Sequence, residues 1–127
     1  RTYVLLADDA RVVGYFAIAP HTIDRDELSK RTGRGAPRHI PAILLAKLAL
    51  QQELQGQGLG AELLVCALAT IVEAARAVGG KVVIVDAIDA TAADFYRHHD
   101  FEPLPDRADR LVLKLSTIAS ALGVDWP

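Results

Sequence analysis

The chain has 127 residues, of which 51% are apolar and 24% are charged. This length fits one domain, and this composition excludes a disordered chain. Charges such as Lys47 and Asp86 break the apolar runs, so none approaches the roughly 20 apolar residues of a membrane-spanning helix. The single cysteine, Cys66, cannot form an intrachain disulfide, which indicates a reducing compartment. We therefore expect a cytoplasmic protein with no membrane contact.

The first part of the chain is predicted to form a β-hairpin followed by a long loop. Two short apolar segments, Thr2–Ala7 and Arg11–Ala19, are expected to pair as strands, with Pro20 closing the second one. The segment from position 21 to Arg38 is polar and rich in glycine and arginine. It is predicted to be a loop that holds one helical turn at Asp24–Lys30.

The rest of the chain is predicted to alternate between strand and helix. Apolar residues recur every three or four positions across Ala61–Val78, which predicts an amphipathic helix with Cys66 as a core thiol. The other expected elements are the strands Pro41–Leu50, Lys81–Ala87 and Arg110–Leu115, a short helix over Ala90–His99 with Thr91 as its N-cap, and a final helical turn over Ser116–Leu122. The order β-β-β-α-β-α-β predicts one α/β (α+β) domain with a mixed sheet.

Positive charge is concentrated in one part of the sequence. Between Leu28 and Gln52 there are five cations and no acid, whereas the remaining residues carry nine cations and sixteen acids. The five cations are Lys30, Arg31, Arg34, Arg38 and Lys47. A local excess of positive charge on an acidic domain indicates an anionic partner at one face; the alternative is a solvated loop.

Three glycines, Gly56, Gly58 and Gly60, stand between a predicted strand and a predicted helix. Glycine allows a tight turn and lets a ligand approach the backbone closely. The first amides of a helix have no partner within the helix, and the helix dipole favours negative charge there, so this segment predicts a phosphate site. The lysine and the hydroxyl residue of a nucleotide P-loop are absent, and the G-x-G-x-G spacing does not fit a dinucleotide-binding fingerprint.

The pattern Gln55-x-x-Gly58-x-Gly60 resembles the acetyl-CoA motif Q/R-x-x-G-x-G/A of the GNAT superfamily of N-acetyltransferases. Downstream, the segment ATAADFYRHHDF resembles the GNAT pattern A-x-x-F-Y-x-x-x-G-F, with Asp100 in place of the usual glycine. This substitution affects a helix-exit turn, where Asp tolerates left-handed geometry better than most residues do. The resemblance implies the GNAT fold, which is a mixed and mostly antiparallel sheet flanked by helices, with a splay between the fourth and fifth family strands.

A narrower resemblance, on the segments RVVGYFAIA, RHIPAILLAKLAL and QGQGLG, is to the GNAT toxins of type II toxin–antitoxin modules. Members of that family acetylate the α-amine of aminoacyl-tRNA and so stop translation. The resemblance implies acetyl-CoA as cofactor, aminoacyl-tRNA as substrate and a small antitoxin of the ribbon–helix–helix type as partner, and it leaves a homodimer open. The family pattern places another strand and helices before Thr2, so residues 1–127 are interpreted as one GNAT domain without these elements.

The resemblance also implies roles for individual residues. Tyr96 matches the general acid that protonates the departing CoA thiolate, since a phenol is protonated at neutral pH. Cofactor contacts are expected from the end of the third strand, the glycine segment and one aromatic residue, namely Leu48, Ala49, Leu50, Gln55, Gly56, Gln57, Gly58, Leu59, Gly60, Ala61 and Phe95. RNA phosphates are expected to contact Lys30, Arg31, Arg34, Arg38, Lys47 and Arg97. No metal site is predicted, because the histidines lack the spacing of metal ligands.

Two other functions fit the sequence. A GNAT enzyme that acts on a small-molecule or protein amine would share the cofactor site and need no RNA contact. A module that binds acyl-CoA without turnover would also carry the glycine segment. No side chain is identified as the general base, because an α-amine with a pKa of about 8 is already partly uncharged at neutral pH.

Overall fold

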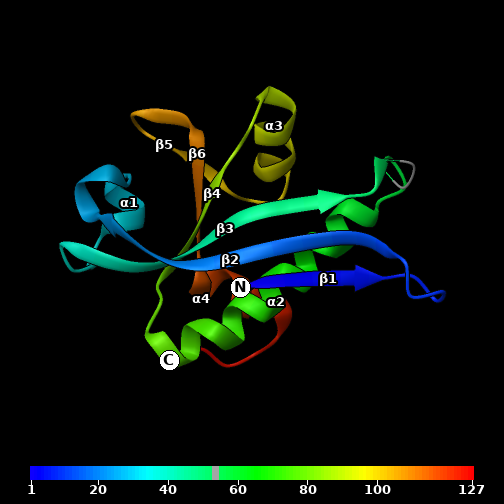
Figure 1. Cartoon of the computed structure of the whole chain (residues 1–127). Coiled ribbons are helices and arrows are strands. Elements are labelled where there is room, and N and C mark those ends of the chain that lie inside the picture. Colours follow the sequence, from blue (N-terminus) through cyan, green and yellow to red (C-terminus); the bar gives the residue numbers. More distant parts are fainter. Residues whose placement is uncertain (53–54) are drawn as a thin grey trace.

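The computed structural model describes residues 1–52 and 55–127, which form a six-stranded sheet with the strand order β1-β2-β3-β4-β6-β5 (Figure 1). The strands are β1 (Thr2–Leu6), β2 (Val12–Asp24), β3 (His39–Leu50), β4 (Val82–Asp86), β5 (Glu102–Leu104) and β6 (Arg107–Lys114). Among these neighbours β3 and β4 are parallel, and the other pairs are antiparallel. The predicted mixed and mostly antiparallel sheet is therefore confirmed.

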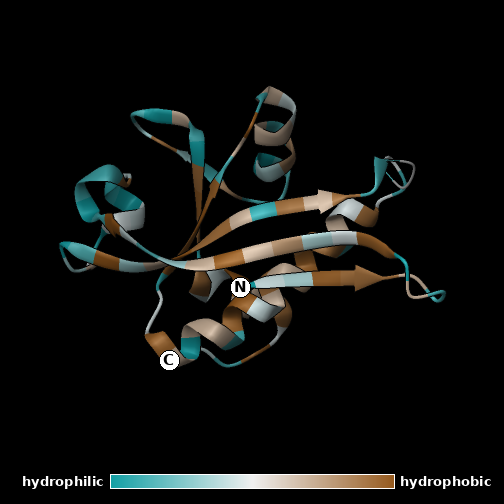
Figure 2. Ribbon diagram, in the orientation of Figure 1, coloured by the Kyte–Doolittle hydropathy of each residue, from teal (hydrophilic) through white to brown (hydrophobic). Residues whose placement is uncertain are grey.

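Helices cover both faces of the sheet, and a hydrophobic core lies under each layer. The helices α2 (Leu59–Val78), α3 (Ala90–His98) and α4 (Leu115–Leu122) pack on one face, while η1 (Arg25–Glu27) and α1 (Lys30–Gly33) belong to the segment over the other face. Along β4, Val83 and Val85 point into the larger core beneath α2, whereas Val82 and Ile84 point into the smaller core. This alternation is the period of a strand that is buried on both sides. Figure 2 shows the hydrophobic residues along the central strands and α2, and hydrophilic residues on α1.

The strand predicted to stop at Pro20 continues to Asp24 as β2. The Ile18 amide donates to the Arg1 carbonyl, so alternation places the Pro20 nitrogen on the same edge of β2. Within the described residues β1 pairs with β2 only from Val12 to Ala17, so no strand of this part of the chain accepts a hydrogen bond from position 20. Proline lacks an N–H, and at this position the sheet loses no hydrogen bond. The prediction of a boundary at Pro20 was therefore wrong.

A bulge separates the two halves of β3. Ala17 of β2 pairs with Lys47, and Ile18 pairs with Leu45, so Ala46 is an extra residue in β3. The parallel ladder between β3 and β4 ends at the pair Leu45–Val85. Beyond the bulge, β3 pairs with β2 alone, and its other edge is released from β4.

Two local predictions were wrong. The N-cap of α3 is Asp89, whose carboxylate accepts from the Ala92 amide at 2.8 Å, and not Thr91. Cys66 is exposed on α2, because the buried positions of that helix lie to either side of it at Leu64 and Ala67. The helical segment predicted over Ser116–Leu122 is confirmed as the helix α4, which begins at Leu115. No helix in the described ranges combines the length and apolar character that crossing a lipid bilayer requires.

Candidate active site

A cavity of about 570 Å³ lies where the end of β3, the start of α2 and the start of α3 meet. Its walls hold most of the residues that the sequence suggested for cofactor binding and catalysis. The lining residues are Leu48, Ala49, Leu50, Gln55, Gly56, Gly58, Gly60, Ala61, Leu63, Ile88, Asp89, Thr91, Ala92, Phe95 and Tyr96. Segments separated by some 40 positions in the chain thus form one concave site.

The glycine segment has a backbone that side-chain-bearing residues rarely adopt. Gly56 and Gly58 have φ of 82° and 78°, in the left-handed region. A Cβ added at either position would meet no other atom within 4 Å, so the requirement there is conformational. Gly60 has an ordinary helical φ, and its added Cβ would lie 3.7 Å from the Phe95 ring on the cavity wall. The first two glycines make the turn, and the third keeps the cavity open.

The N-terminus of α2 presents amides to this cavity. Gly58 is the N-cap residue and offers no side chain to the first amides, and the first helical bond runs from Glu62 to the Gly58 carbonyl. Within the described residues, the amides of Leu59, Gly60 and Ala61 have no hydrogen-bond acceptor. Such amides, together with the positive end of a 20-residue helix, fit the diphosphate of a nucleotide-containing cofactor.

The released edge of β3 forms the opposite wall. The Gln51 amide donates to the Val13 carbonyl of β2 at 2.7 Å, so alternation turns the amides of Leu48 and Leu50 away from β2, toward the cavity. The Gln55 side chain donates from Nε2 to the Leu50 carbonyl at 3.0 Å, which fixes the glycine segment against this edge. A ligand with amide groups could therefore pair with β3 as a short additional strand.

Tyr96 projects from α3 into the same cavity. Its side chain is 92% buried, and its ring contacts those of Phe95 and Phe101 edge-on, with centroids 5.4 and 5.5 Å away. Burial raises the pKa of the Tyr96 hydroxyl above its ordinary value of 10, so the hydroxyl carries its proton at neutral pH. It has no hydrogen-bond partner among the described residues, which leaves the proton available to a ligand.

Sequence reasoning missed part of this wall and suggested two residues that do not line it. Gln57 and Leu59 belong to the glycine segment but are not on the cavity wall. Five residues on the wall were not predicted as site residues, namely Leu63, Ile88, Asp89, Thr91 and Ala92. Ile88 is 92% exposed, and an isoleucine in a loop directly after a buried strand was the available signal.

The cations suggested for RNA binding lie outside the cavity, in separate places. Lys30, Arg31, Arg34 and Arg38 belong to the segment around α1, which precedes the opposite end of β3 from Leu50. Arg31 is tied to Glu102 of β5 by an ion pair of 3.1 Å. Arg97 pairs with Asp94 at 2.6 Å, and Lys47 is exposed near the end of β3. Lys30, Arg34, Arg38 and Lys47 have no acidic partner within the described residues.

Residues 1–103 match the family model for the acetyltransferase (GNAT) domain. The chain belongs to the GNAT acetyltransferase family. It is therefore an acetyltransferase, and acetyl-CoA is its acetyl donor. The glycine segment, the amides of α2 and the free edge of β3 provide this GNAT domain with a site of the kind that such a donor requires.

Among similar proteins, a tRNA-acetylating toxin of Mycobacterium tuberculosis is 36% identical over 115 residues, which cover 91% of this chain and 69% of the relative. A probable toxin TacT of Sinorhizobium fredii is 32% identical over 97% of this chain and 74% of its own. The structure of AtaT complexed with acetyl-methionyl-tRNAfMet superimposes with a TM-score of 0.85 at 30% identity, over 96% of this chain and 75% of AtaT. The structure of a tyrosine-to-phenylalanine mutant of AtaT, bound to acetyl-CoA and the C-terminus of the antitoxin AtaR, superimposes with a TM-score of 0.79 at 28% identity. The match covers 96% of this chain and 72% of the AtaT chain. This GNAT chain thus resembles the toxin branch of its family, as its sequence suggested.

Proposed function

We propose that this acetyltransferase transfers the acetyl group of acetyl-CoA to the α-amine of aminoacyl-tRNA and thereby blocks translation. The observation that carries the proposal is the 36% identity, over 91% of the chain, to a tRNA-acetylating toxin. The structure of AtaT with an acetylated aminoacyl-tRNA, which has the same fold, supports it. The similar proteins thus indicate the acceptor, and the geometry of the cavity indicates the roles of individual residues.

The cavity residues divide the binding of acetyl-CoA between them. The amides of Leu59, Gly60 and Ala61 would hold the diphosphate, and the edge of β3 at Leu48 and Leu50 would pair with the amide groups of the pantetheine arm. Bound acetyl-CoA supplies an activated acetyl thioester. An amide of the β3 edge that points into the cavity can donate a hydrogen bond to an oxygen that gains negative charge there.

Tyr96 is proposed to act as the general acid. Its buried hydroxyl is protonated at neutral pH and faces the cavity without a partner in the described part of the chain. It can therefore give its proton to a thiolate formed inside the cavity. The neutral fraction of an α-amine, whose pKa is about 8, is the nucleophile, so the chain needs no strong base.

The cations around α1 are proposed to contact the phosphates of tRNA. Lys30, Arg34 and Arg38 precede the opposite end of β3 from Leu50, so a ligand that touches both them and the cavity must be longer than a small amine. Arg31 and Arg97, which are paired with Glu102 and Asp94, are weaker contacts than their positions in the sequence suggested. Lys47 is exposed and directly precedes Leu48 on the cavity wall, so it is the cation nearest to the expected 3′ end.

The toxin assignment includes a partner. By analogy with AtaT, which was solved with the C-terminus of the antitoxin AtaR, we propose that a small antitoxin neutralises this chain in the cytoplasm. We further propose that this antitoxin is of the ribbon–helix–helix type and that the toxin acts as a homodimer. Co-expression that restores growth, and the mass of the purified complex, test these points.

The decisive assay measures transfer of labelled acetyl groups from acetyl-CoA to charged tRNA, with deacylated tRNA as the control. We expect label on charged tRNA only, and loss of transfer in Tyr96→Phe with unchanged binding of CoA. Absence of transfer to any charged tRNA by an enzyme that acetylates other amines would reject the tRNA assignment.

The second candidate is acetylation of a small-molecule or protein amine. It is favoured by the absence of a Lys or Arg among the residues that line the cavity. Arg34→Glu and Arg38→Glu separate the two functions, with Arg11→Glu in the β1–β2 turn as the matched control. RNA binding predicts that only the first two weaken transfer and each lowers the salt dependence by about one unit of slope, whereas the alternative predicts no change.

A further inference from the structure

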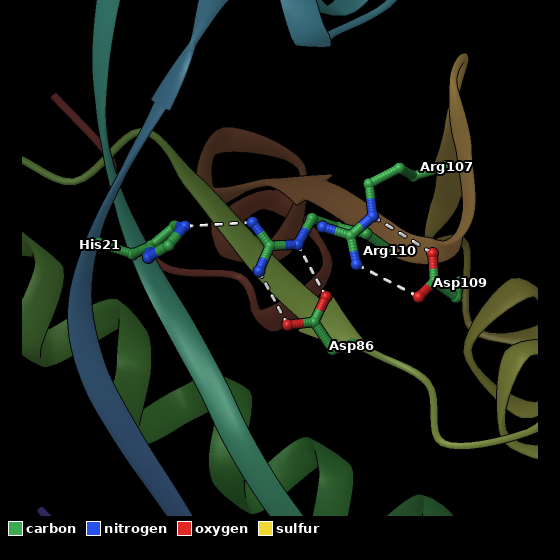
Figure 3. A network of polar contacts seen from close by, with 5 residues as sticks. All are labelled: His21, Asp86, Arg107, Asp109 and Arg110. Atoms are coloured by element: carbon green, nitrogen blue, oxygen red, sulfur yellow. Dashed lines mark hydrogen bonds and ion pairs between the residues drawn. The ribbon is translucent and has the colours of Figure 1, made fainter.

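Three side chains that are far apart in the sequence form a polar network on the sheet face opposite α2 (Figure 3). Arg110 of β6 donates from Nε and Nη2 to the two carboxylate oxygens of Asp86, at 2.7 and 2.8 Å. Its Nη1 lies 3.2 Å from Nε2 of His21, which belongs to β2. The Arg110 side chain is only 14% exposed, so it is held in place rather than solvated.

The network stands at the opening of the sheet beside the catalytic cavity. Asp86 directly follows Val85, the last residue of β4 that pairs with β3. Val85 faces α2, so its neighbour Asp86 faces the other side of the sheet. Arg110 faces that side too, because the next residue, Leu111, faces α2. His21 does so as well, because it lies two residues before Ile23, which belongs to the smaller core on that side. The face toward α2 is filled by α2 and α3. An amine that approaches an acetyl group held between β3 and β4 therefore arrives past this network.

The hydrogen bonds fix the chemistry that the network offers. An arginine only donates, so His21 accepts at Nε2 and carries its proton on Nδ1. Of the five N–H groups of Arg110, one on Nη1 and one on Nη2 are left for a ligand. The Asp86 carboxylate balances the Arg110 charge. The His21 Nδ1–H points away from Arg110, so Arg110 alone offers its two remaining N–H groups to a ligand. Since the Arg110–Asp86 pair has no net charge, these donors fit a carbonyl oxygen better than a phosphate.

We propose that Arg110 binds the carbonyl oxygen next to the acceptor amine, and that Asp86 and His21 are the positioning residues that orient Arg110. The preferred acceptor is then an α-amino acyl group, as in an aminoacyl ester, and not a simple alkylamine. This inference rests on the proposed function and deepens it, because it assigns acceptor recognition to residues that lie outside the cofactor cavity.

The test compares matched acceptors with and without the carbonyl: alanine methyl ester against ethylamine, phenylalanine methyl ester against phenethylamine, and charged tRNA. The variants are His21→Ala, His21→Gln, Asp86→Asn and Arg110→Gln. Arg107→Gln is the control, because Arg107 forms a similar bidentate pair with Asp109 at the exposed turn of β6. Each acceptor is compared between wild type and variant, which cancels differences in amine basicity.

We expect His21→Ala and Arg110→Gln to raise KM for the esters and for charged tRNA about tenfold or more, with little effect on the alkylamines and on CoA binding by calorimetry. Asp86→Asn should act in the same direction. His21→Gln should retain most activity, since its amide oxygen can accept from Arg110 and keep the guanidinium oriented. Arg107→Gln should equal wild type.

Equal effects on esters and alkylamines, or none on either, would overturn the inference, as would a wild type that transfers to no member of the panel. His21→Ala keeps the test independent of folding, because it leaves the Arg110–Asp86 pair intact. Network-dependent transfer to esters without any transfer to charged tRNA would support the inference and reject the proposed function.

Discussion

Substitution of Gly60 by leucine should weaken cofactor binding, whereas alanine at the same position should raise the stability of the fold and leave binding unchanged. Gly60 has a helical φ, and an added Cβ would make ordinary contacts of 3.7 and 3.9 Å with the Phe95 ring, so alanine introduces no strain. Alanine in a helix is better than glycine by about 0.5–1 kcal/mol, which corresponds to a rise in Tm of roughly 2–5 °C. The motif Q/R-x-x-G-x-G/A admits alanine at this position, but the longer leucine side chain would stand on the wall of the 570 Å³ cavity, where the first amides of α2 lie.

Loss of one charge-assisted hydrogen bond to a phosphate costs about 1.5–3 kcal/mol, which is a loss of affinity of about 10- to 100-fold. Calorimetric titration with CoA and thermal unfolding measure the two effects separately. Gly79→Ala is the matched control at the other end of α2, where φ is 72° and the site is distant from the cavity. It should lower stability by about 1 kcal/mol and leave affinity unchanged. Wild-type affinity in Gly60→Leu would refute the cradle at the helix N-terminus.

Three further predictions concern other residues. Tyr96→Phe should lower kcat about 100-fold or more at unchanged CoA affinity and Tm, and a near-normal kcat would exclude Tyr96 as the general acid. Asp100 follows α3 with φ of 72°, so Asp100→Gly should raise the free energy of unfolding in urea by up to about 1 kcal/mol. A lower free energy of unfolding would mean that the Asp100 side chain stabilises the turn. Glu102 has a lowered pKa, mainly because Thr32 and then Arg31 donate hydrogen bonds to it. The ionised Glu102 therefore stabilises the fold above its unfolded pKa, near 4.5, and this stabilisation is lost as the pH falls through the lower folded pKa. Glu102→Gln should lower the free energy of unfolding at pH 7. It should also make that free energy depend less on pH in the acid range, as measured by unfolding at a series of pH values.

The parts of the site that the sequence predicted depend on neighbouring residues. The sequence predicts a turn at residues 56–60 because left-handed backbone favours glycine. The positive φ angles of Gly56 and Gly58 confirm that turn. Tyr96 reaches the cavity because α3 begins beside the end of β4, which follows from the order of a strand, a turn and a helix. The tolerance of Asp100 for left-handed geometry was likewise a local property, and its φ confirms it.

The parts that were missed depend on pairs that are distant in sequence. His21 and Arg110 are 89 positions apart, and Arg31 and Glu102 are 71 apart, so no local pattern indicates that they meet. The continuation of β2 past Pro20 depends on which edge of the strand its nitrogen faces, which proline itself does not reveal. The sequence correctly located an excess of positive charge between Leu28 and Gln52. It could not show that Glu102 of β5 pairs with one of these cations, Arg31.

The extra residue at Ala46 connects the fold to the chemistry. Without it, the β3–β4 ladder would extend past Leu45 and Val85, and backbone hydrogen bonds would occupy the edge that now faces the cavity. The bulge frees that edge while β3 stays bound to β2, so the wall remains rigid although the sheet is open. An opening through a sheet has two sides, and here the glycine cradle and Tyr96 occupy one side while His21, Asp86 and Arg110 occupy the other. Donor and acceptor can thus approach one point from opposite faces, which is the arrangement that direct transfer between two bound substrates requires.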